Sequence, residues 1–192
     1  MSTLAATNLK NASSGSNNIV LNTDGTTTVT SPSNIIKSGT AVASTSGTSI
    51  DFTSIPSWVK RVTVMFSGVS TNGTSNVQVQ LGTAGGFQTT NYLGATSILT
   101  GVSAPANFSS GLLITGAMGA GVLLHGALTL AVVDAASGTW ASTTITGRSD
   151  TNQLNVGGGT KTLSGTLDRV RITTVGGTDT FDAGTINILY EG

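Results

Sequence analysis

The chain has 192 residues, of which 26 are Gly, 34 are Thr and 23 are Ser, while only 8% are charged. With no Cys and a single His, the composition excludes disulfide scaffolds, Cys-ligated metal centres and His-rich metal sites within one chain. The formal net charge of zero gives no long-range field for nucleic acid or anionic lipid, so we expect neither as a partner.

The rest of the composition favours a β-rich domain with a neutral surface. Hydrophobic residues make up 38% of the chain, enough for a core, and the length suits one domain with an appendage. Thr suits a pleated sheet because its Cβ is branched, so this chain predicts β-sheet covered by hydroxyls and amides. The first residues lack a basic region followed by an apolar run, and we expect no signal peptide.

Residues 1–36 differ from the rest and predict a separate N-terminal segment. Asp24-Gly25 lies between two strand-favouring runs and predicts a β-hairpin whose two-residue loop pairs Val20 with Val29. The large apolar residues of the first strand are Ile19, Val20 and Leu21. Three such residues are too few for a core, so we expect the hairpin to be ordered only against copies of itself or a larger partner.

Residues 37–192 predict a succession of strands, after a turn or linker at residues 31–34. Residues 58–66 alternate, with one apolar face. Residues 76–81 (NVQVQL) alternate most strictly, with Val and Leu side chains inward and Asn and Gln side chains outward. Together the two runs predict a half-buried hairpin with one face in water.

Further strands follow at regular intervals. A turn at residues 134–138 separates strand candidates at 127–133 and 139–146, and residues 168–175 and 185–190 alternate again. About eight strand candidates and no convincing helix predict an all-β fold, specifically an antiparallel β-sandwich that is jelly-roll-like. The predicted domains are an attachment segment at 1–36 and a sandwich at 37–192.

The middle of the chain, residues 62–133, contains no Lys, Arg, Asp or Glu. Within it, residues 111–133 are long enough to cross a bilayer, but they include five Gly and lack flanking positive charges. Two strands joined by a Gly-rich turn at 116–121, buried or facing other copies, explain them better. We therefore expect no membrane insertion, with a membrane-active segment and a short helix as the alternatives.

Residues with catalytic potential are few, and we predict no catalytic residue, metal ligand or cofactor. His125 lies in an apolar run without a nucleophile elbow, which favours a structural role. Residues 157–162 (GGGTKT) lack the Lys and Ser/Thr spacing of a phosphate loop and predict a flexible turn. Asp179 and Asp182 are the nearest approach to the carboxylate pair of a glycoside hydrolase, but both flank predicted turns.

Three aromatic residues lie in or near predicted loops, where a ring could stack on a sugar. They are Phe87, Tyr92 and Trp140. Packing in the core is the favoured alternative for each. No other ligand-binding residue is indicated by the sequence.

Several longer stretches resemble a known group of proteins. TNLKNASSGSNNIVLNTDGTTTV resembles the N-terminal segment of many tailed-bacteriophage, notably cyanophage, fibre and appendage proteins. Residues 39–82 resemble the start of a module common in phage tail-fibre and other virion proteins, and DRVRITTVGGTDTFDAGTINILYEG is similar to its end. These stretches cover most of the chain.

The resemblance implies a virion location, homotrimers of β-rich domains, binding of host-surface glycans, and attachment to other virion proteins through the N-terminal segment with Ile19, Val20 and Leu21. Trimer contacts would bury the uncharged middle. The short chain leaves little room for a shaft, so we expect a non-enzymatic short tail or head fibre. The alternatives are a capsid decoration protein and a glycan depolymerase using Asp179 and Asp182.

Overall fold

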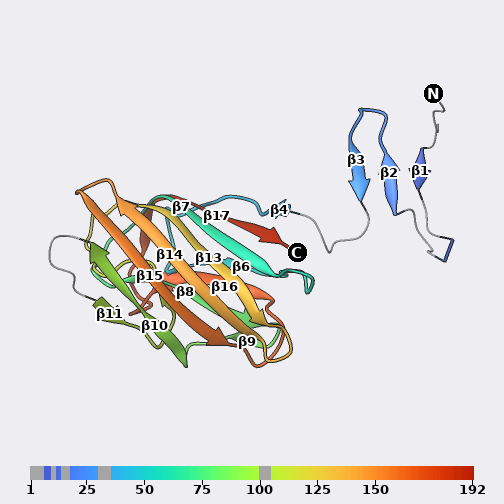
Figure 1. Cartoon of the computed structure of the whole chain (residues 1–192). Helices are drawn as coiled ribbons and strands as arrows, with labels where there is room; N and C mark the ends of the chain where they lie inside the picture. Colours follow the sequence, from blue (N-terminus) through green and yellow to red (C-terminus); the bar gives the residue numbers. More distant parts are fainter. Residues whose placement is uncertain (1–6, 10–11, 14–17, 30–35, 100–104) are drawn as a thin grey trace.

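Every regular element in the described part of the chain is a β-strand. The computed structural model describes residues 7–9, 12–13, 18–29, 36–99 and 105–192. The strands form three antiparallel sheets (Figure 1). The predicted all-β antiparallel fold is confirmed, whereas the jelly-roll connection pattern stays a prediction. The linker predicted at residues 31–34 lies outside the described residues.

The first sheet is built only from the N-terminal segment. Its strands, in order, are β1 (Asn8–Leu9), β2 (Ile19–Leu21) and β3 (Thr27–Val29). The predicted hairpin is present, but its register is shifted by one: Val20 pairs with Thr28 and not with Val29. The loop is longer than predicted because the Asn22 amide bonds to the Thr26 carbonyl, which leaves three residues in the turn. Gly25 ends that turn at φ +82°, a conformation that favours glycine.

The second sheet has nine strands and is the nearer layer in Figure 1. Its order is β11 (Pro105–Asn107), β10 (Tyr92–Leu99), β15 (Gln153–Thr162), β14 (Thr139–Arg148), β13 (Leu124–Asp134), β7 (Arg61–Thr71), β17 (Phe181–Glu191) and β4 (Ile36–Ser38), with β5 (Val42–Ala43) also paired to β17. The predicted β13–β14 hairpin with its turn at 134–138 is confirmed. The GGGTKT run belongs to β15, so the flexible turn predicted there is wrong.

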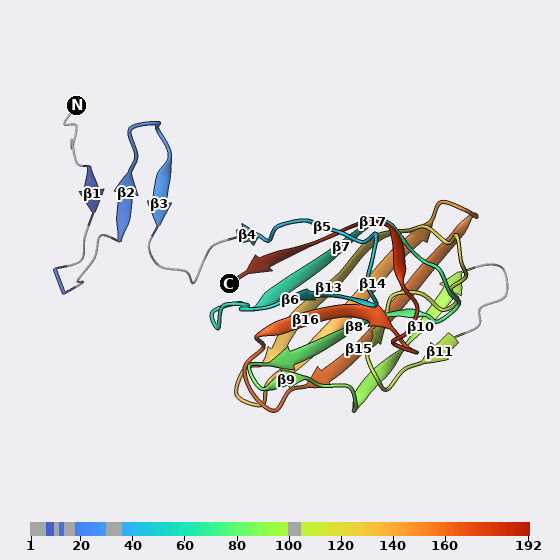
Figure 2. The same ribbon diagram turned by 180° about the vertical axis from the view of Figure 1, so that it is seen from behind.

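The third sheet has five strands and is the nearer layer in Figure 2. Its order is β12 (Leu112–Leu113), β8 (Val77–Thr83), β16 (Arg169–Thr174) and β6 (Ser49–Phe52), with β9 (Gly86–Phe87) also paired to β8. This sheet packs against the nine-stranded sheet, and the core lies between them. The molecule from residue 36 onward is therefore a two-layer sandwich.

The core draws on both layers through alternating strands. Its central side chains include Val62, Val64 and Phe66 of β7 and Val77, Val79 and Leu81 of β8. These two strands belong to different sheets, so the hairpin predicted between them is wrong. The connection at residues 72–76 instead crosses from one layer to the other, where the Ser75 amide donates to the Asp179 carboxylate at 2.8 Å.

The uncharged middle of the chain supplies much of this core. Its buried side chains in the 111–133 run include Leu112, Ile114, Leu124, Leu128 and Leu130. The predicted pair of strands exists, but β12 and β13 lie in different sheets and do not pair. These side chains are covered within a single copy and need no trimer contacts for burial, whereas Leu93, Leu99 and Val133 of the uncharged middle stay exposed. Among the described residues, no helix is long and apolar enough to span a membrane.

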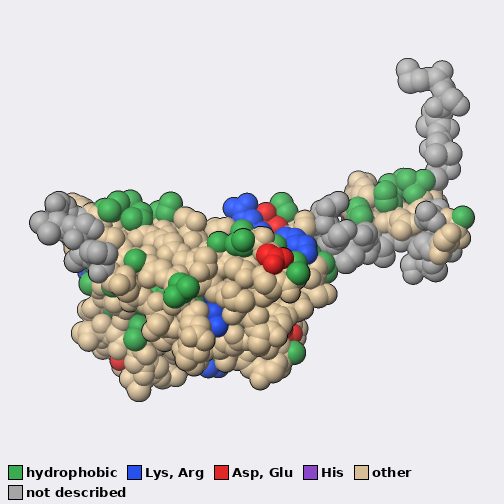
Figure 3. Space-filling model, turned by 60° about the horizontal axis from the view of Figure 1, so that its bottom comes forward, with side chains coloured by type: hydrophobic (Ala, Val, Ile, Leu, Met, Phe, Trp, Pro, Cys, Tyr) green, Lys and Arg blue, Asp and Glu red, His purple; other side chains and the backbone are tan. Residues whose placement is uncertain are grey.

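The surface of the sandwich is mostly uncharged. In Figure 3 most of the visible face is tan, with few blue or red side chains. The four arginines are each paired with a carboxylate, in Arg61–Glu191, Arg148–Asp150, Arg169–Asp168 and Arg171–Asp51. The arginine charges on this surface are therefore compensated locally.

Candidate functional site

A polar groove lies on the outer face of the five-stranded sheet. Its volume is about 320 Å³, and its lining includes Ser49, Gln78, Gln80, Ser110, Arg171 and Thr173. That size is at the lower end of the range of roughly 300–1,000 Å³ that is typical for ligand sites. We call this feature the groove.

The register of three strands sets the chemistry of the groove floor. Gln80, Arg171 and Asp51 lie directly opposite one another across β8, β16 and β6. The next outward row is Gln78, Thr173 and Ser49. Because side chains alternate along a strand, the residues between these rows point into the core. Two parallel rows of hydrogen-bonding side chains result.

The two glutamines are buried, contrary to the water-exposed face predicted for this strand. Gln78 is 2% exposed and Gln80 is 6% exposed. The segment around Ser110 covers them: its hydroxyl donates to Gln78 Oε1 at 2.9 Å, and its carbonyl accepts from Gln80 Nε2 at 2.9 Å. Gln78 Nε2 also donates to the Thr174 carbonyl at 3.3 Å. These bonds fix the amide orientations before any ligand arrives.

Arg171 is held in one position by two partners. Its Nε and Nη2 donate to the two carboxylate oxygens of Asp51 at 2.8 and 2.7 Å. Its guanidinium carbon lies 4.1 Å from the centroid of the Phe87 ring. The hydrogen bond that Arg171 donates to Asp51 raises the pKa of Arg171, so the guanidinium remains charged. Phe87 thus presents one ring face to Arg171. It does not line the groove itself but contacts the guanidinium of a residue that does.

Gly82 makes room for a second arginine beside the same ring. It lies opposite Arg169 on one side and Phe87 on the other. A Cβ at position 82 would lie 2.7 Å from Arg169 Cγ and 2.6 Å from the Gly86 carbonyl oxygen, closer than real contacts allow. Arg169 therefore crosses β8 over bare backbone, with its guanidinium carbon 5.7 Å from the Phe87 centroid.

Tyr92 and Trp140 are core residues, 1% and 5% exposed, so the structure places neither ring where a sugar could stack. Between the parts of β8 that pair with β12 and with β9, Tyr92 supplies a hydrogen-bond partner for the strand. Its hydroxyl accepts from the Leu81 amide at 2.6 Å and donates to the Gln88 carbonyl at 2.8 Å. Lys161 lies over its ring, 5.1 Å from the centroid.

Tyr92 gives the fold a specific response to alkaline pH. Burial raises the pKa of Tyr92 from 10.0 to about 12. The unfolded chain therefore loses this proton first, and we expect the free energy of unfolding to fall as pH rises from about 10 to about 12. Urea titrations of wild type and Tyr92→Phe across that range test this.

The variant should be less stable at pH 8 by about 1–3 kcal/mol, because the Leu81 amide loses its acceptor. It should also show a smaller alkaline decline. Some decline remains, since burial raises the pKa of Tyr190 in the same direction. Identical pH profiles for the two proteins would contradict this assignment.

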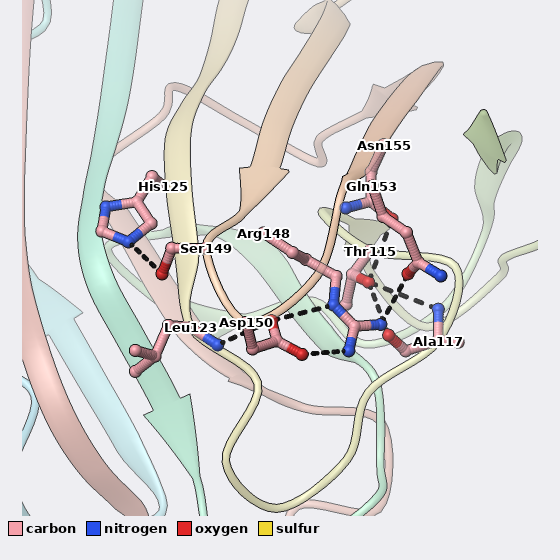
Figure 4. A network of polar contacts seen from close by, with 9 residues as sticks. All are labelled: Thr115, Ala117, Leu123, His125, Arg148, Ser149, Asp150, Gln153 and Asn155. Atoms are coloured by element: carbon pink, nitrogen blue, oxygen red, sulfur yellow. Dashed lines mark hydrogen bonds and ion pairs between the residues drawn. The ribbon is translucent and has the colours of Figure 1, made fainter. Parts of the chain in front are cut away.

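His125 contacts Ser149, but the tautomer opposes nucleophile activation (Figure 4). The Gly68 amide donates to Nδ1 at 3.1 Å, which makes that nitrogen an acceptor. The proton then resides on Nε2, which donates to the Ser149 hydroxyl at 3.1 Å. His125 in this state has no free lone pair with which to deprotonate Ser149.

The neighbouring carboxylate in Figure 4 belongs to a different contact. Asp150 accepts from Arg148 at 2.6 Å, and this hydrogen bond lowers the pKa of Asp150. Of the two carboxylates considered as a catalytic pair, Asp179 accepts a hydrogen bond from the Ser75 amide, and Asp182 is exposed on β17. Asp150 and Asp179 are thus each engaged by a local hydrogen bond, and no group of three or more potential metal ligands occurs among the described residues.

The N-terminal sheet carries an apolar face. Leu9, Ile19 and Val29 lie directly opposite one another across its three strands, and Leu21 projects from the same face two residues further on. Leu9, Leu21 and Val29 are 43%, 42% and 47% exposed. Val20 points to the other face, so the structure divides the predicted attachment set and adds two residues that sequence reasoning missed.

Comparison of the chain with models of protein families, with curated proteins and with solved structures gave no match. Two surfaces have features that indicate contact with other kinds of molecules. One is the groove with its Arg171–Asp51 pair, and the other is the apolar face of the N-terminal sheet.

Proposed function

We propose that the protein is a non-enzymatic structural protein of a bacteriophage virion, a short tail or head fibre. The N-terminal sheet docks on the particle, and the sandwich projects to bind a host-surface glycan. The observation that carries the docking role is the apolar row Leu9–Ile19–Val29, whose outer members Leu9 and Val29 are 43% and 47% exposed. Among the described residues, the strands of this sheet pair with no strand of the sandwich. The virion location is supported by the sequence resemblance.

Glycan binding is assigned to the groove. Sugar hydroxyls both donate and accept hydrogen bonds, and the groove offers amides, hydroxyls and the Arg171 guanidinium, whose partner Asp51 lies beside it on β6. Side chains fixed by strands and by prior hydrogen bonds lose little entropy on binding. A neutral, pre-organised polar floor of this kind suits recognition without chemistry.

Assembly as a homotrimer is part of the proposal, through the outer face of the nine-stranded sheet. There Ile145 lies opposite Val156, and Leu99 lies opposite Leu154. Ile145 is 56% exposed and Leu99 is 50% exposed. Six strands about 4.8 Å apart and about 33 Å long offer roughly 950 Å². That area matches the roughly 800 Å² that each partner buries in a stable interface.

Immunolabelling of purified particles tests the proposed location. An antibody raised against the sandwich should label a tail or head appendage in negative-stain images. Signal spread over the capsid faces would contradict the fibre assignment and favour the capsid decoration alternative. Soluble protein should also compete with particles for adsorption to host cells, and the absence of competition would contradict receptor binding.

A further inference from the structure

The groove contains no uncompensated charge. Arg171 and Asp51 form a two-bond ion pair in which both side chains are about one-third exposed (33% and 32%). The nearby Arg169 has its own carboxylate, with Nε and Nη2 donating to Asp168 at 3.0 and 2.9 Å. A ligand in the groove therefore meets hydrogen-bonding dipoles and the Arg171 guanidinium, whose charge is paired with that of Asp51 beside the groove.

The Arg171–Asp51 pair retains hydrogen-bonding capacity toward a ligand. Nε and Nη2 of Arg171 are engaged by Asp51, and among the described residues no protein acceptor lies on Nη1. Each Asp51 oxygen receives one of these bonds and has further lone pairs. One donor and one acceptor thus lie side by side, the pattern that two adjacent hydroxyls of a sugar ring match.

The second outward row extends this pattern. The Thr173 hydroxyl donates to the Thr48 carbonyl at 2.9 Å, so its oxygen is left to accept. The amide groups of Gln78 and Gln80 are oriented by the Ser110 segment. The floor is consequently a fixed array of donors and acceptors from β8, β16 and β6.

We infer that the groove selects an uncharged pyranose with adjacent free hydroxyls and rejects uronic or sialic acids. This inference rests on the proposed glycan-binding function. The carboxylate of an acidic sugar would either displace Asp51 from Arg171 or lie next to Asp51. In the first case Asp51 loses its counter-charge, and in the second case the sugar carboxylate has none. Neutral hydroxyls bridge the pair without breaking it.

The test uses the full-length protein and oligosaccharides in matched pairs, each neutral sugar beside its uronate counterpart, such as galactotriose and trigalacturonate. Calorimetric titration should give at least ~10-fold tighter binding of the neutral member. That binding should change little when salt is raised, since screening acts on charged ligands. Tighter binding of the acidic member would overturn the inference.

Asp51→Asn supplies the decisive variant. It keeps the shape of the side chain but leaves Arg171 without a counter-charge, so the preference should invert toward the acidic sugar. Glu191→Gln is the matched control, because Glu191 pairs with Arg61 on the other sheet, at 3.7 Å. The control should bind as wild type does.

An unchanged preference in Asp51→Asn, with circular dichroism showing the variant folded, would overturn the inference. If no sugar of either class binds, the inference is also wrong. The proposed fibre function is judged separately, by particle labelling and adsorption competition, so its failure and the failure of the sugar assignment are distinguishable.

Discussion

Deletion of residues 1–35 is expected to leave a folded sandwich that no longer joins the particle. Among the described residues, the three N-terminal strands pair with no strand of the sandwich, and the first buried residue of the sandwich is Ser44. Ile36 is kept because it pairs with Glu191 at the edge of the nine-stranded sheet. Thermal unfolding of the purified truncated chain, together with mass spectrometry of assembled particles, measures both parts of this result.

A pair of subtler variants separates the apolar face from the mere presence of the segment. Ile19→Thr with Leu21→Thr removes two side chains from the apolar face while keeping strand propensity. Val20→Thr makes the same change on the opposite face. The double variant should lose incorporation at least ~10-fold, as two buried aliphatic side chains contribute about 1.5–3 kcal/mol each. Incorporation of the truncated chain at the wild-type level would refute the docking role.

Placing charges on the outer face of the nine-stranded sheet should dissociate the trimer without unfolding the chain. Ile145→Asp with Leu154→Asp puts two carboxylates where copies are proposed to meet. Both positions are exposed in one copy, at 56% and 40%, so the cost to the fold should be about 0.5 kcal/mol or less per site. At the interface the same carboxylates would be buried without partners, at several kcal/mol each.

Light scattering measures the outcome directly. Wild type should have a mass of about 57 kDa, three times the 19.1 kDa of the chain, and the double variant should approach the mass of one chain. Val175→Asp is the control, since Val175 is 51% exposed and follows β16 in the other sheet. A wild-type protein that is monomeric at micromolar concentration would rule out this assembly.

The alternation of apolar residues predicted most strands and most core positions. In β7, β13, β16 and β17, hydrophobic side chains recur at about every second position, and the structure buries that face. In β14 the buried face is instead mostly Ser and Thr, and Ile145 lies on the exposed face. Alternation says which residues point inward, because a strand has a period of two. It does not say which sheet a strand joins, and the hairpin that it suggests between β7 and β8 does not form.

Local composition predicted the wrong conformation for residues 157–162, where contacts with a strand distant in sequence determine the structure. Gly157 and Gly159 indicated a flexible turn, yet they lie in the middle of β15. A Cβ on Gly157 would lie 2.4 Å from Thr96 Oγ1, and one on Gly159 would lie 2.6 Å from the Leu93 carbonyl oxygen. These glycines permit close approach of β10, a requirement that only the folded sheet reveals.

The candidate site was even less accessible to sequence reasoning. Asp51 and Arg171 are 120 positions apart and meet only because β6 and β16 are in register. Phe87 lies near a loop and is a candidate for stacking on a sugar, but one face of its ring is occupied by the Arg171 guanidinium. The alternation of residues 168–175 placed Arg171 outward, and no sequence signal indicated which carboxylate faced it.

A density map of the whole particle tests the central proposal most directly. The map should show an appendage whose projecting end fits the two-layer sandwich, with the groove turned outward and the Leu9–Ile19–Val29 face against another virion protein. Particles that contain no such density, or an appendage whose N-terminal sheet points away from the particle, would contradict it.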